Sequence, residues 1–394
     1  MSKLVFLALG AFVVGTEAFV VAGILPQIAD DLGTTLPVAG QLVTFFALAY
    51  ALGSPLLAVA TGAIERRRLL LLSLALFALG NLAAAFAHSY VALLVARLLL
   101  ALTAGTFMPA ASAYAALSVE PAKRGRALAL VYSGMTFATV IGMPLGTSIG
   151  QALGWRASFF GVAALALFAL CGIALALPRL AAPPAVSLGE RLAVASRRDV
   201  LAILSLTTLA LAGAFTIFTY IAPFLHQAAG FDDSTLPLLL FAFGIAGAIG
   251  NAIGGYAADH WDLRRYVAAL FAILAIAFIF LSMVVTQLHG PWTKPLVIFG
   301  LAAWGLAGWG MPTAQQARLV ARDPRHAAVL ISLNASALYL GSAIGAALGS
   351  LTIAYVAVAK LGFVAAVMEG VGIAVLIATA SVTRRRELRV VGSK

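Results

Sequence analysis

Charged residues are scarce in this chain. They make up 10% of its 394 residues, whereas hydrophobic residues make up 63%. A soluble domain usually carries about 25% charged residues. Because no soluble core of this length could bury so much apolar surface, the composition excludes an ordinary soluble protein. It predicts that lipid surrounds most of the chain.

Cysteine is rare, and metal-ligand patterns and nucleotide-binding motifs are lacking. The single cysteine, Cys171, excludes an internal disulfide framework and a cysteine-based metal site. None of the five histidines has the spacing of a metal-ligand pair. No lysine precedes Ser or Thr, which excludes a P-loop. We therefore expect no metal, no cofactor and no enzyme activity.

Long apolar runs dominate the sequence instead. A membrane-spanning helix needs roughly 20 mostly apolar residues. The first run is long enough to be a retained helix rather than a cleaved signal peptide. Twelve runs qualify, an even number that places both termini on the same side of the membrane. They cover about residues 4–26, 37–60, 69–88, 91–117, 127–150, 157–178, 200–226, 236–258, 267–287, 295–317, 327–350 and 360–382.

Basic residues are distributed unequally between the two predicted sides. One side holds 21 of the 25 lysines and arginines, the other holds Arg156, Lys294 and Lys360, and Arg97 lies inside a run. Lysine and arginine concentrate in the cytoplasmic loops of membrane proteins. The pattern predicts that both termini are cytoplasmic, and it accounts for the net charge of +11 without a nucleic-acid partner.

The two halves of the chain share motifs at offsets of 197 to 203 residues. The basic loop at 65–68 returns at 262–265, and the Gly-to-Pro segment at 105–109 returns at 308–312. We therefore predict an all-α integral membrane fold with twelve transmembrane helices in two pseudo-symmetric six-helix bundles. The bundles would span residues 1–178 and 200–394, the second ending in a short basic cytoplasmic tail, with a cytoplasmic linker loop at 179–199. Parallel repeats place a substrate site between the halves near the bilayer midplane.

The stretch from 133 to 150 carries no charge but has a glycine at every fourth position near its end. Gly142, Gly146 and Gly150 share one helix face, and Pro144 lies among them. Glycine and proline weaken a helix in water, whereas in a bilayer small residues let a second helix approach closely. The same spacing returns at 341, 345 and 349. Ordinary packing and a sliding interface between helices both remain open for this stretch.

Two ionisable residues lie deep inside predicted helices. Glu17 precedes Pro26 by nine residues, and Arg97 follows Tyr90 by seven, so both are expected roughly 10–13 Å from the outer surface. Charges at such depth usually mark proton or substrate pathways. Glu17 and Arg97 could pair if their helices are neighbours. For Glu369, in the last run, a structural role and a place near a polar pocket both remain open.

Aromatic and small polar residues on several helices could form a substrate cavity. Aromatic walls with few amides and hydroxyls suit an organic ligand of mixed polarity. Ordinary packing remains the alternative for each residue. The candidates are Phe45, Tyr50, Phe215, Thr219, Trp304, Trp309, Asn334 and Tyr339.

With these residues placed, the chain resembles the major facilitator superfamily, in particular its twelve-helix drug:proton antiporter-like branch. Segments 15–20 and 25–32 are similar to the first helix of arabinose-efflux-type, sugar-efflux and purine-nucleoside-efflux permeases. Gly142, Pro144 and Gly146, followed by a Gly-Trp-Arg sequence at 154–156, resemble the family's antiporter motif. The resemblance implies that these residues shape the interface between the halves and that Arg97 takes part in proton coupling.

The family's loop signature after the second helix is only partly present. Its acidic residue is missing before Arg66 and Arg67, whereas the second half keeps Asp259 ahead of Arg264 and Arg265. The resemblance implies a cytoplasmic gate built from these five residues, with Asp259 paired to a basic residue when the transporter is open to the outside. A plain solvated helix cap is the alternative for Asp259.

We therefore expect a secondary active transporter of the bacterial cytoplasmic membrane. It would export a small organic compound in exchange for protons by alternating access, with Glu17 as the proton carrier. The alternative is an uncoupled facilitator or a proton symporter that imports a small nutrient. The expected partners are the substrate, protons and the lipid bilayer, and we expect a monomer.

Overall fold

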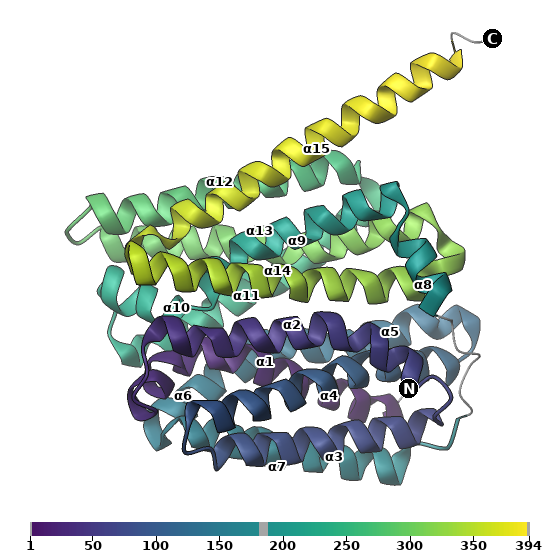
Figure 1. Ribbon diagram of the computed structural model, residues 1–394, viewed down its shortest axis with the longest axis horizontal. Coiled ribbons are helices and arrows are strands. Elements are labelled where there is room, and N and C mark those ends of the chain that lie inside the picture. The colour runs from purple at the N-terminus through teal and green to yellow at the C-terminus, as the bar shows by residue number, and fades with distance from the viewer. Residues whose placement is uncertain (1, 181–187, 392–394) are drawn as a thin grey trace.

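The computed structural model describes residues 2–180 and 188–391 (Figure 1). The described residues form helices and no strands, and twelve helices are long and apolar enough to cross a membrane. In the first half these are α1 (Val5–Asp31), α2 (Leu36–Ala60), α3 (Arg66–Ala85), α4 (Tyr90–Leu117), α5 (Arg124–Phe137) with η3 (Ala138–Gly142) and α6 (Met143–Leu153), and α7 (Trp155–Ala176). In the second half they are α9 (Arg198–Phe218), α11 (Leu236–His260), α12 (Leu263–Gln287), α13 (Thr293–Arg322), α14 (Ala327–Tyr355) and α15 (Leu361–Val391). Twelve spans in an all-helical fold were predicted, and this prediction is confirmed.

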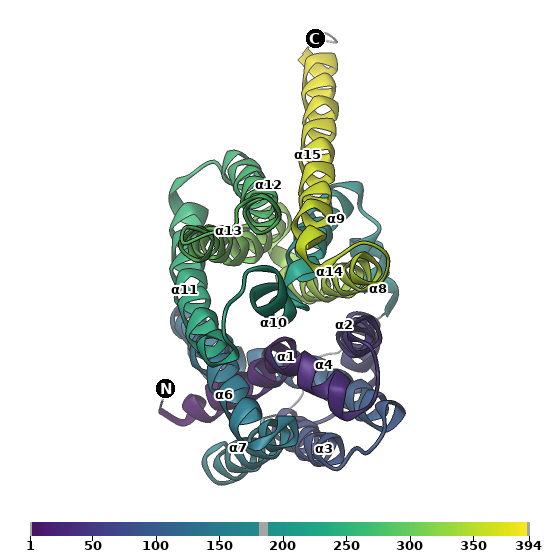
Figure 2. The same cartoon turned by 90° about the vertical axis from the view of Figure 1, so that its left-hand side faces the viewer.

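Helices α1–α7 form one half of the molecule and α9–α15 the other (Figure 1). The halves meet where α2 packs on α14 and where α11 packs on η3 and α6. We call the end that carries the loops at 61–65, 118–120 and 261–262 the basic end, and the opposite end the far end. Both ends of the chain lie toward the basic end (Figure 1). Seen from the far end, the short helix α10 (Ile221–Pro223) lies centrally between the halves (Figure 2).

The first helix is longer than predicted. It continues through Pro26 to Asp31, because a membrane helix tolerates the loss of the hydrogen bond that proline removes. It ends where Gly33 adopts a left-handed conformation with φ of 60° and the N–H of Thr34 bonds to the carbonyl of Ala29. Glu17 therefore lies about 20 Å from the far end of α1, deeper than the prediction from Pro26 placed it.

The seventh span breaks earlier than predicted. A continuous helix over 200–226 was expected, but α9 ends at Phe218 and is followed by α10 and the π-helical turn η4 (Phe224–Ala228). Pro223 explains the break, since its ring clashes with the carbonyl four residues earlier and it donates no hydrogen bond. The break turns Tyr220 inward, where it is fully buried.

The glycine face of the fifth span packs inside the first half. A Cβ added to Gly142, Gly146 or Gly150 would lie 2.0 to 2.6 Å from side-chain atoms of Thr16, Val20 or Ile24 of α1. The prediction that these glycines shape the interface between the halves is therefore wrong for this structure. Pro144 is buried at the start of α6, after the π-helical turn η3.

The second half repeats this packing. Gly341, Gly345 and Gly349 of α14 lie against backbone carbonyls of α9, and an added Cβ would lie 2.4 to 2.6 Å from them. Each glycine face thus joins the fifth helix of a half to the first helix of the same half. The pseudo-symmetry predicted from the motifs is present in the packing.

The predicted linker at 179–199 is only partly described. Residues 181–187, which include Pro183 and Pro184, lie outside the described residues. The remainder includes α8 (Leu188–Ala195), which is attached to the second half: Arg191 Nη1 donates to Ser332 Oγ at 3.5 Å, and Glu190 Oε1 lies 3.6 Å from His326 Nε2. The domain boundaries at 178 and 200 stay predictions.

Candidate proton and substrate site

Glu17 and Arg97 meet in the interior of the first half. Glu17 of α1 accepts a hydrogen bond from Arg97 Nη1 of α4, and both side chains are fully buried. The sequence left this pairing open because it could not show that α1 and α4 are neighbours. An ion pair removed from water is stable only when both charges are present, because either charge alone would be uncompensated.

The pair is incompletely satisfied. Glu17 Oε2 and Arg97 Nε and Nη2 have no hydrogen-bond partner among the described residues, although all three are buried. The ring of Phe46 from α2 covers the guanidinium, with 4.2 Å between Arg97 Cζ and the ring centroid. Such a cation–π contact stabilises a desolvated guanidinium. The unsatisfied Glu17 oxygen is free to take a proton, and protonation would weaken the bond to Arg97.

Aromatic rings connect this pair to the second half. The centroid of Phe46 lies 6.4 Å from that of Tyr339 of α14, and Tyr339 stacks on Tyr50 of α2 at 3.6 Å. On α1, Phe19 lies two residues beyond Glu17, and its ring contacts Phe218 at 5.9 Å and Trp309 at 5.6 Å. Phe46 thus links the ion pair to Tyr339 of the second half, and Phe19 makes a separate aromatic contact between the halves from another face of α1.

The predicted cavity residues separate into two groups. Tyr50, Tyr339, Phe215 and Trp309 lie near the contact between the halves, and all but Tyr50 are half-buried. The remaining residues do not line that contact and are described next.

Trp304 is a core residue of the second half, enclosed by Phe218, Phe243 and Phe278. Asn334 is buried and accepts a hydrogen bond from Thr207 at 3.0 Å, within the same half. Thr219 is fully buried at the break after α9. These three side chains are buried in this structure, and their place in a cavity wall stays a prediction.

Phe45 is 41% exposed, and its neighbour Phe46 faces the ion pair instead. One residue along a helix rotates the side chain by about 100°, so sequence alone could not choose between them. Phe19 and Phe218 were also missed. The spacing of Phe19 from Glu17 was visible in the sequence, but its partners on α9 and α13 were not.

Polar bonds between the halves are confined to the far end. Gln41 Nε2 of α2 donates to Ser350 Oγ of α14 at 2.9 Å, and Ser350 Oγ donates to the Pro37 carbonyl at 2.9 Å. Gln151 Nε2 donates to the Asp233 carbonyl at 2.9 Å. These are the three hydrogen bonds between halves among the described residues. We call them the far-end latch.

Tyr220 reinforces the latch by packing on Gly40. A Cβ at Gly40 would lie 1.9 Å from the Tyr220 hydroxyl, which itself donates to the Ala346 carbonyl at 3.1 Å. The ring thus fills the space that glycine leaves on α2. This contact closes the far end around the break in the seventh span.

The predicted gate residues make their bonds within their own halves. Arg67 donates to the Ala174 carbonyl of α7, and Arg264 Nη2 donates to the Leu376 carbonyl of α15 at 3.0 Å. Ala174 lies in the last turn of α7, where a cation is favourable. The cross-half gate is thus not formed by Arg67 or Arg264 in this structure. Arg66, Arg265 and Asp259 form no ion pair in the described part of the chain, and Asp259 is exposed.

Glu65 and Asp262 explain why the basic loops repeat. Each carboxylate is the N-cap of the next helix and accepts from two backbone N–H groups, those of Arg67 and Arg68 or those of Arg264 and Arg265. Burial opposes ionisation of Glu65, but these donors and the N–H of Leu180 hold its pKa below the ordinary value. The N–H of Arg265, followed by that of Arg264, lowers the pKa of Asp262.

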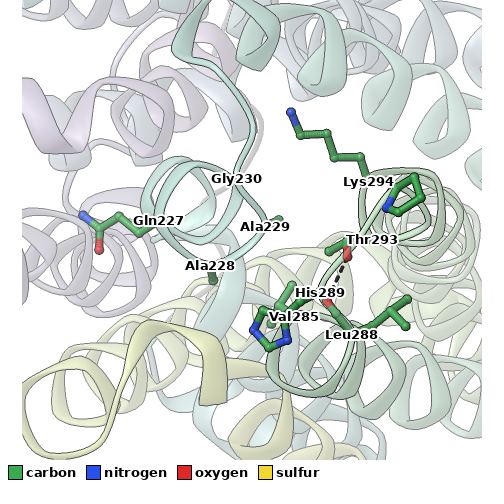
Figure 3. A pocket seen from close by; sticks show the side chains of 11 residues that line it. Gln227, Ala228, Ala229, Gly230, Val285, Leu288, His289, Thr293 and Lys294 are labelled. Carbon is green, nitrogen blue, oxygen red and sulfur yellow. Dashed lines mark hydrogen bonds between the residues drawn. The ribbon is translucent and has the colours of Figure 1, made fainter.

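A cavity of about 540 Å³ lies at the far end of the second half (Figure 3). Residues 227–230 line one side, and Val285, Leu288, His289 and Lys294 are among those that line the other (Figure 3). None of the predicted substrate residues lines it. This cavity is therefore separate from the ion pair and the aromatic contacts.

Comparison with known proteins agrees with this architecture. The family model described as Major Facilitator Superfamily matches residues 7–346. The chain belongs to this superfamily. The resemblance found in the sequence is confirmed, and the chain is a membrane transporter rather than an enzyme.

Relatives of this family member include transporters and a drug-resistance protein. The chain is 36% identical to an uncharacterized MFS-type transporter, YbcL of Bacillus subtilis, over 95% of this chain and 94% of the relative. It is 37% identical to a chloramphenicol resistance protein of Streptomyces lividans, over 65% of this chain and 66% of the relative. It is 30% identical to a probable sugar efflux transporter of Mannheimia succiniciproducens, over 94% and 92%.

A solved structure has the same fold. The human organic anion transporter MFSD10 (TETRAN) superposes with a TM-score of 0.70, covering 95% of this chain and 99% of that one. Its sequence identity is 17%, so this likeness concerns the fold alone.

Proposed function

We propose that this superfamily member is a proton-coupled efflux transporter for a small organic compound, with its basic end in the cytoplasm. The observation that supports it best is the buried Glu17–Arg97 pair, which is incompletely hydrogen-bonded and is linked through Phe46 to Tyr339 of the other half. Charged groups at this depth in a membrane usually serve ion or substrate pathways. Relatives named for sugar efflux and chloramphenicol resistance support the direction of transport.

The geometry suggests how protonation would be coupled to movement. A proton on Glu17 neutralises one member of the pair and releases Arg97 toward Phe46. Phe46 contacts Tyr339, so a shift of the guanidinium changes the contact between α2 and α14. In this proposal the substrate binds beside the half-buried Phe215 and Trp309, and the halves rock about that point.

The test uses purified protein in liposomes with radiolabelled chloramphenicol and a radiolabelled galactoside as probes. A pH gradient that is acidic on the far-end side should drive at least one probe against its concentration gradient. Glu17→Gln should abolish this proton-driven movement, whereas Glu17→Asp, which keeps a carboxyl, should retain part of it. Undiminished proton-driven transport by Glu17→Gln would remove Glu17 from the mechanism.

Counterflow without a pH gradient separates the remaining possibilities. Equal exchange with and without the gradient would indicate an uncoupled facilitator. Probe accumulation in the same direction as the protons would indicate a symporter. Either result would contradict the proposed antiport.

The orientation is tested separately. Single cysteines placed at Ala63 and Ser89, in a Cys171→Ser background, mark the basic and far ends. A membrane-impermeant maleimide added to intact cells should label only the cysteine at Ser89. Labelling of only the cysteine at Ala63 would reverse the proposed orientation.

A further inference from the structure

A second carboxyl is buried in the other half of the molecule. Glu369 of α15 has no exposed surface, and neither of its carboxyl oxygens has a hydrogen-bond partner in the part of the chain that the structure describes. It lies eight residues after the start of α15 at Leu361, so about 12 Å inside the span. A buried polar group without a partner requires an explanation, such as a bound proton, ion or water.

The carboxyl points at α9 rather than at lipid. A Cβ placed on Gly213 would lie 2.3 Å from Glu369 Oε1 and 2.9 Å from the Ala365 carbonyl oxygen. The carboxyl therefore fills the space that this glycine leaves on α9. Gly213 lies five residues before Phe218, whose ring contacts Phe19 of the first half. Glu369 therefore contacts α9 less than two helical turns from the residue that touches the first half.

Among the side chains that the structure describes, no cation faces Glu369 from the elements around it. Helices α9, α12 and α14 and the turn η7 (Val358–Lys360) surround this part of α15. Except for Tyr339, which stacks on Tyr50, their ionisable residues lie near the ends of the spans. The residues near the ends are Arg198, Asp199, Arg264, Arg265, Tyr266, Tyr355 and Lys360. In α15 itself the first arginine is Arg384, 15 residues after Glu369.

The negative charges of Glu17 and Glu369 are therefore neutralised by different groups. Glu17 has Arg97, whereas the group available to neutralise Glu369 is a proton. A bare carboxylate at this depth costs at least about 2.5 kcal/mol. The uncharged acid is therefore the form that this position favours, and loss of its proton requires water or a cation to enter between α9 and α15.

We propose that Glu369 is a second proton-binding site that gains and loses a proton during the transport cycle. Each half would then hold one such carboxyl, Glu17 on its first helix and Glu369 on its last. The proposal rests on the proton coupling proposed above. It adds that proton release from Glu369 accompanies loosening of the contact between α15 and Gly213 of α9.

Infrared spectroscopy tests this without any substrate. Protein in liposomes is measured for the carbonyl band of a protonated carboxyl, in H₂O and D₂O, from about pH 5 to about pH 10. Glu369→Gln should lose one band that Glu17→Gln keeps. That band should shift in D₂O and fade as the pH rises. If the band neither shifts in D₂O nor loses intensity as the pH rises, Glu369 is a permanently protonated structural acid, and the proposal is overturned.

The wild-type protein provides a second readout in case Glu369→Gln fails to fold. Dicyclohexylcarbodiimide reacts with protonated carboxyls in apolar surroundings, and mass spectrometry locates the adduct. We expect an adduct on Glu369 that forms more slowly at higher pH. Absence of modification at Glu369 at any pH would overturn the proposal.

Transport separates this proposal from the proposed function. With chloramphenicol or the galactoside as the probe and a pH-sensitive dye, Glu369→Gln should move about half as many protons per probe molecule as wild type. An unchanged ratio, with Glu17→Gln inactive, would overturn the role of Glu369 and leave proton-coupled efflux intact. Wild-type protein without proton-driven transport would overturn the proposed function, and the infrared result alone would then decide whether Glu369 exchanges protons.

Discussion

At the scale of single residues, the two members of the buried ion pair are not equivalent. A carboxylate can accept a proton and become neutral, whereas a guanidinium keeps its charge in proteins. Removing Arg97 therefore leaves a group that can neutralise itself, and removing Glu17 leaves a charge that cannot. Phe46 compensates that charge only in part.

This difference gives a stability prediction. Glu17→Gln should destabilise the protein by about 3–5 kcal/mol, the usual cost of leaving one buried charge unpaired. Arg97→Gln should cost less, and the double variant should cost less than Glu17→Gln alone. Thermal unfolding in detergent, followed by tryptophan fluorescence, measures all three. Equal losses in the two single variants would contradict the unequal roles of the two charges.

At the scale of elements, the same close contacts recur in both halves. Glycines join the fifth helix of each half to its first helix, and carboxylate N-caps begin the third helix of each half. Sequence periodicity showed the glycine face at 142–150 and its repeat at 341–349, because spacing along one helix is a local signal. It could not show the partner, since that depends on which helices become neighbours.

The effect of a Gly→Ala substitution on stability should therefore differ between closely packed and open glycine positions. Gly345→Ala brings a Cβ to 2.4 Å from the Ala212 carbonyl of α9, and overpacking of this kind costs about 1–3 kcal/mol. Gly255 of α11 has no atom within 4 Å of an added Cβ, so Gly255→Ala should be neutral or stabilising by up to about 1 kcal/mol. Melting temperatures of the two variants, compared with wild type, provide the check; a tolerated Gly345→Ala would contradict the packing of α14 on α9.

The carboxylate caps predict a dependence on pH. The pKa of Asp262 is lowered in the folded protein from its ordinary 3.8. Its contribution is therefore present above that ordinary value and lost as the pH falls through the lowered one. Asp262→Ala should cost about 1 kcal/mol near neutral pH, and its difference from wild type should shrink as the pH falls below about 4.

Asp259→Ala is the matched control for this cap. Asp259 lies three residues earlier, is exposed and forms no ion pair in the described part of the chain. Its loss should leave the melting temperature unchanged from acid to neutral pH. A pH-independent difference between Asp262→Ala and wild type would show that the cap does not act through its charge.

At the scale of the whole molecule, the number of spans and the two related halves followed from the sequence. Apolar runs of spanning length and repeated motifs can be read along the chain, so predicting them does not require knowing which helices are neighbours. The contact between the halves was beyond prediction, because it depends on rotations of single helices. Phe45 and Phe46 show this: the predicted residue is exposed, and the next one covers Arg97.

The far-end latch can be tested by crosslinking. Cysteines replacing Gln41 and Ser350, whose side chains are hydrogen-bonded at 2.9 Å, should be joined by a short bifunctional thiosulfonate reagent, which links them through reducible disulfides, in a Cys171→Ser background. The crosslinked protein should lose transport of the liposome probes, and reduction should restore it. Full transport in the crosslinked state would show that the halves do not need to separate at the far end.

The far-end latch also has an energetic consequence. Its three hydrogen bonds contribute about 0.5–1.5 kcal/mol each, so its polar part is of the order of a few kcal/mol. One proton that moves down a gradient of one pH unit releases about 1.4 kcal/mol, and 100 mV of membrane potential adds about 2.3 kcal/mol. The two quantities match in size. If protons drive the cycle as proposed, the energy from one proton is comparable to the polar part of the latch, and a few added hydrogen bonds there would hold the transporter shut.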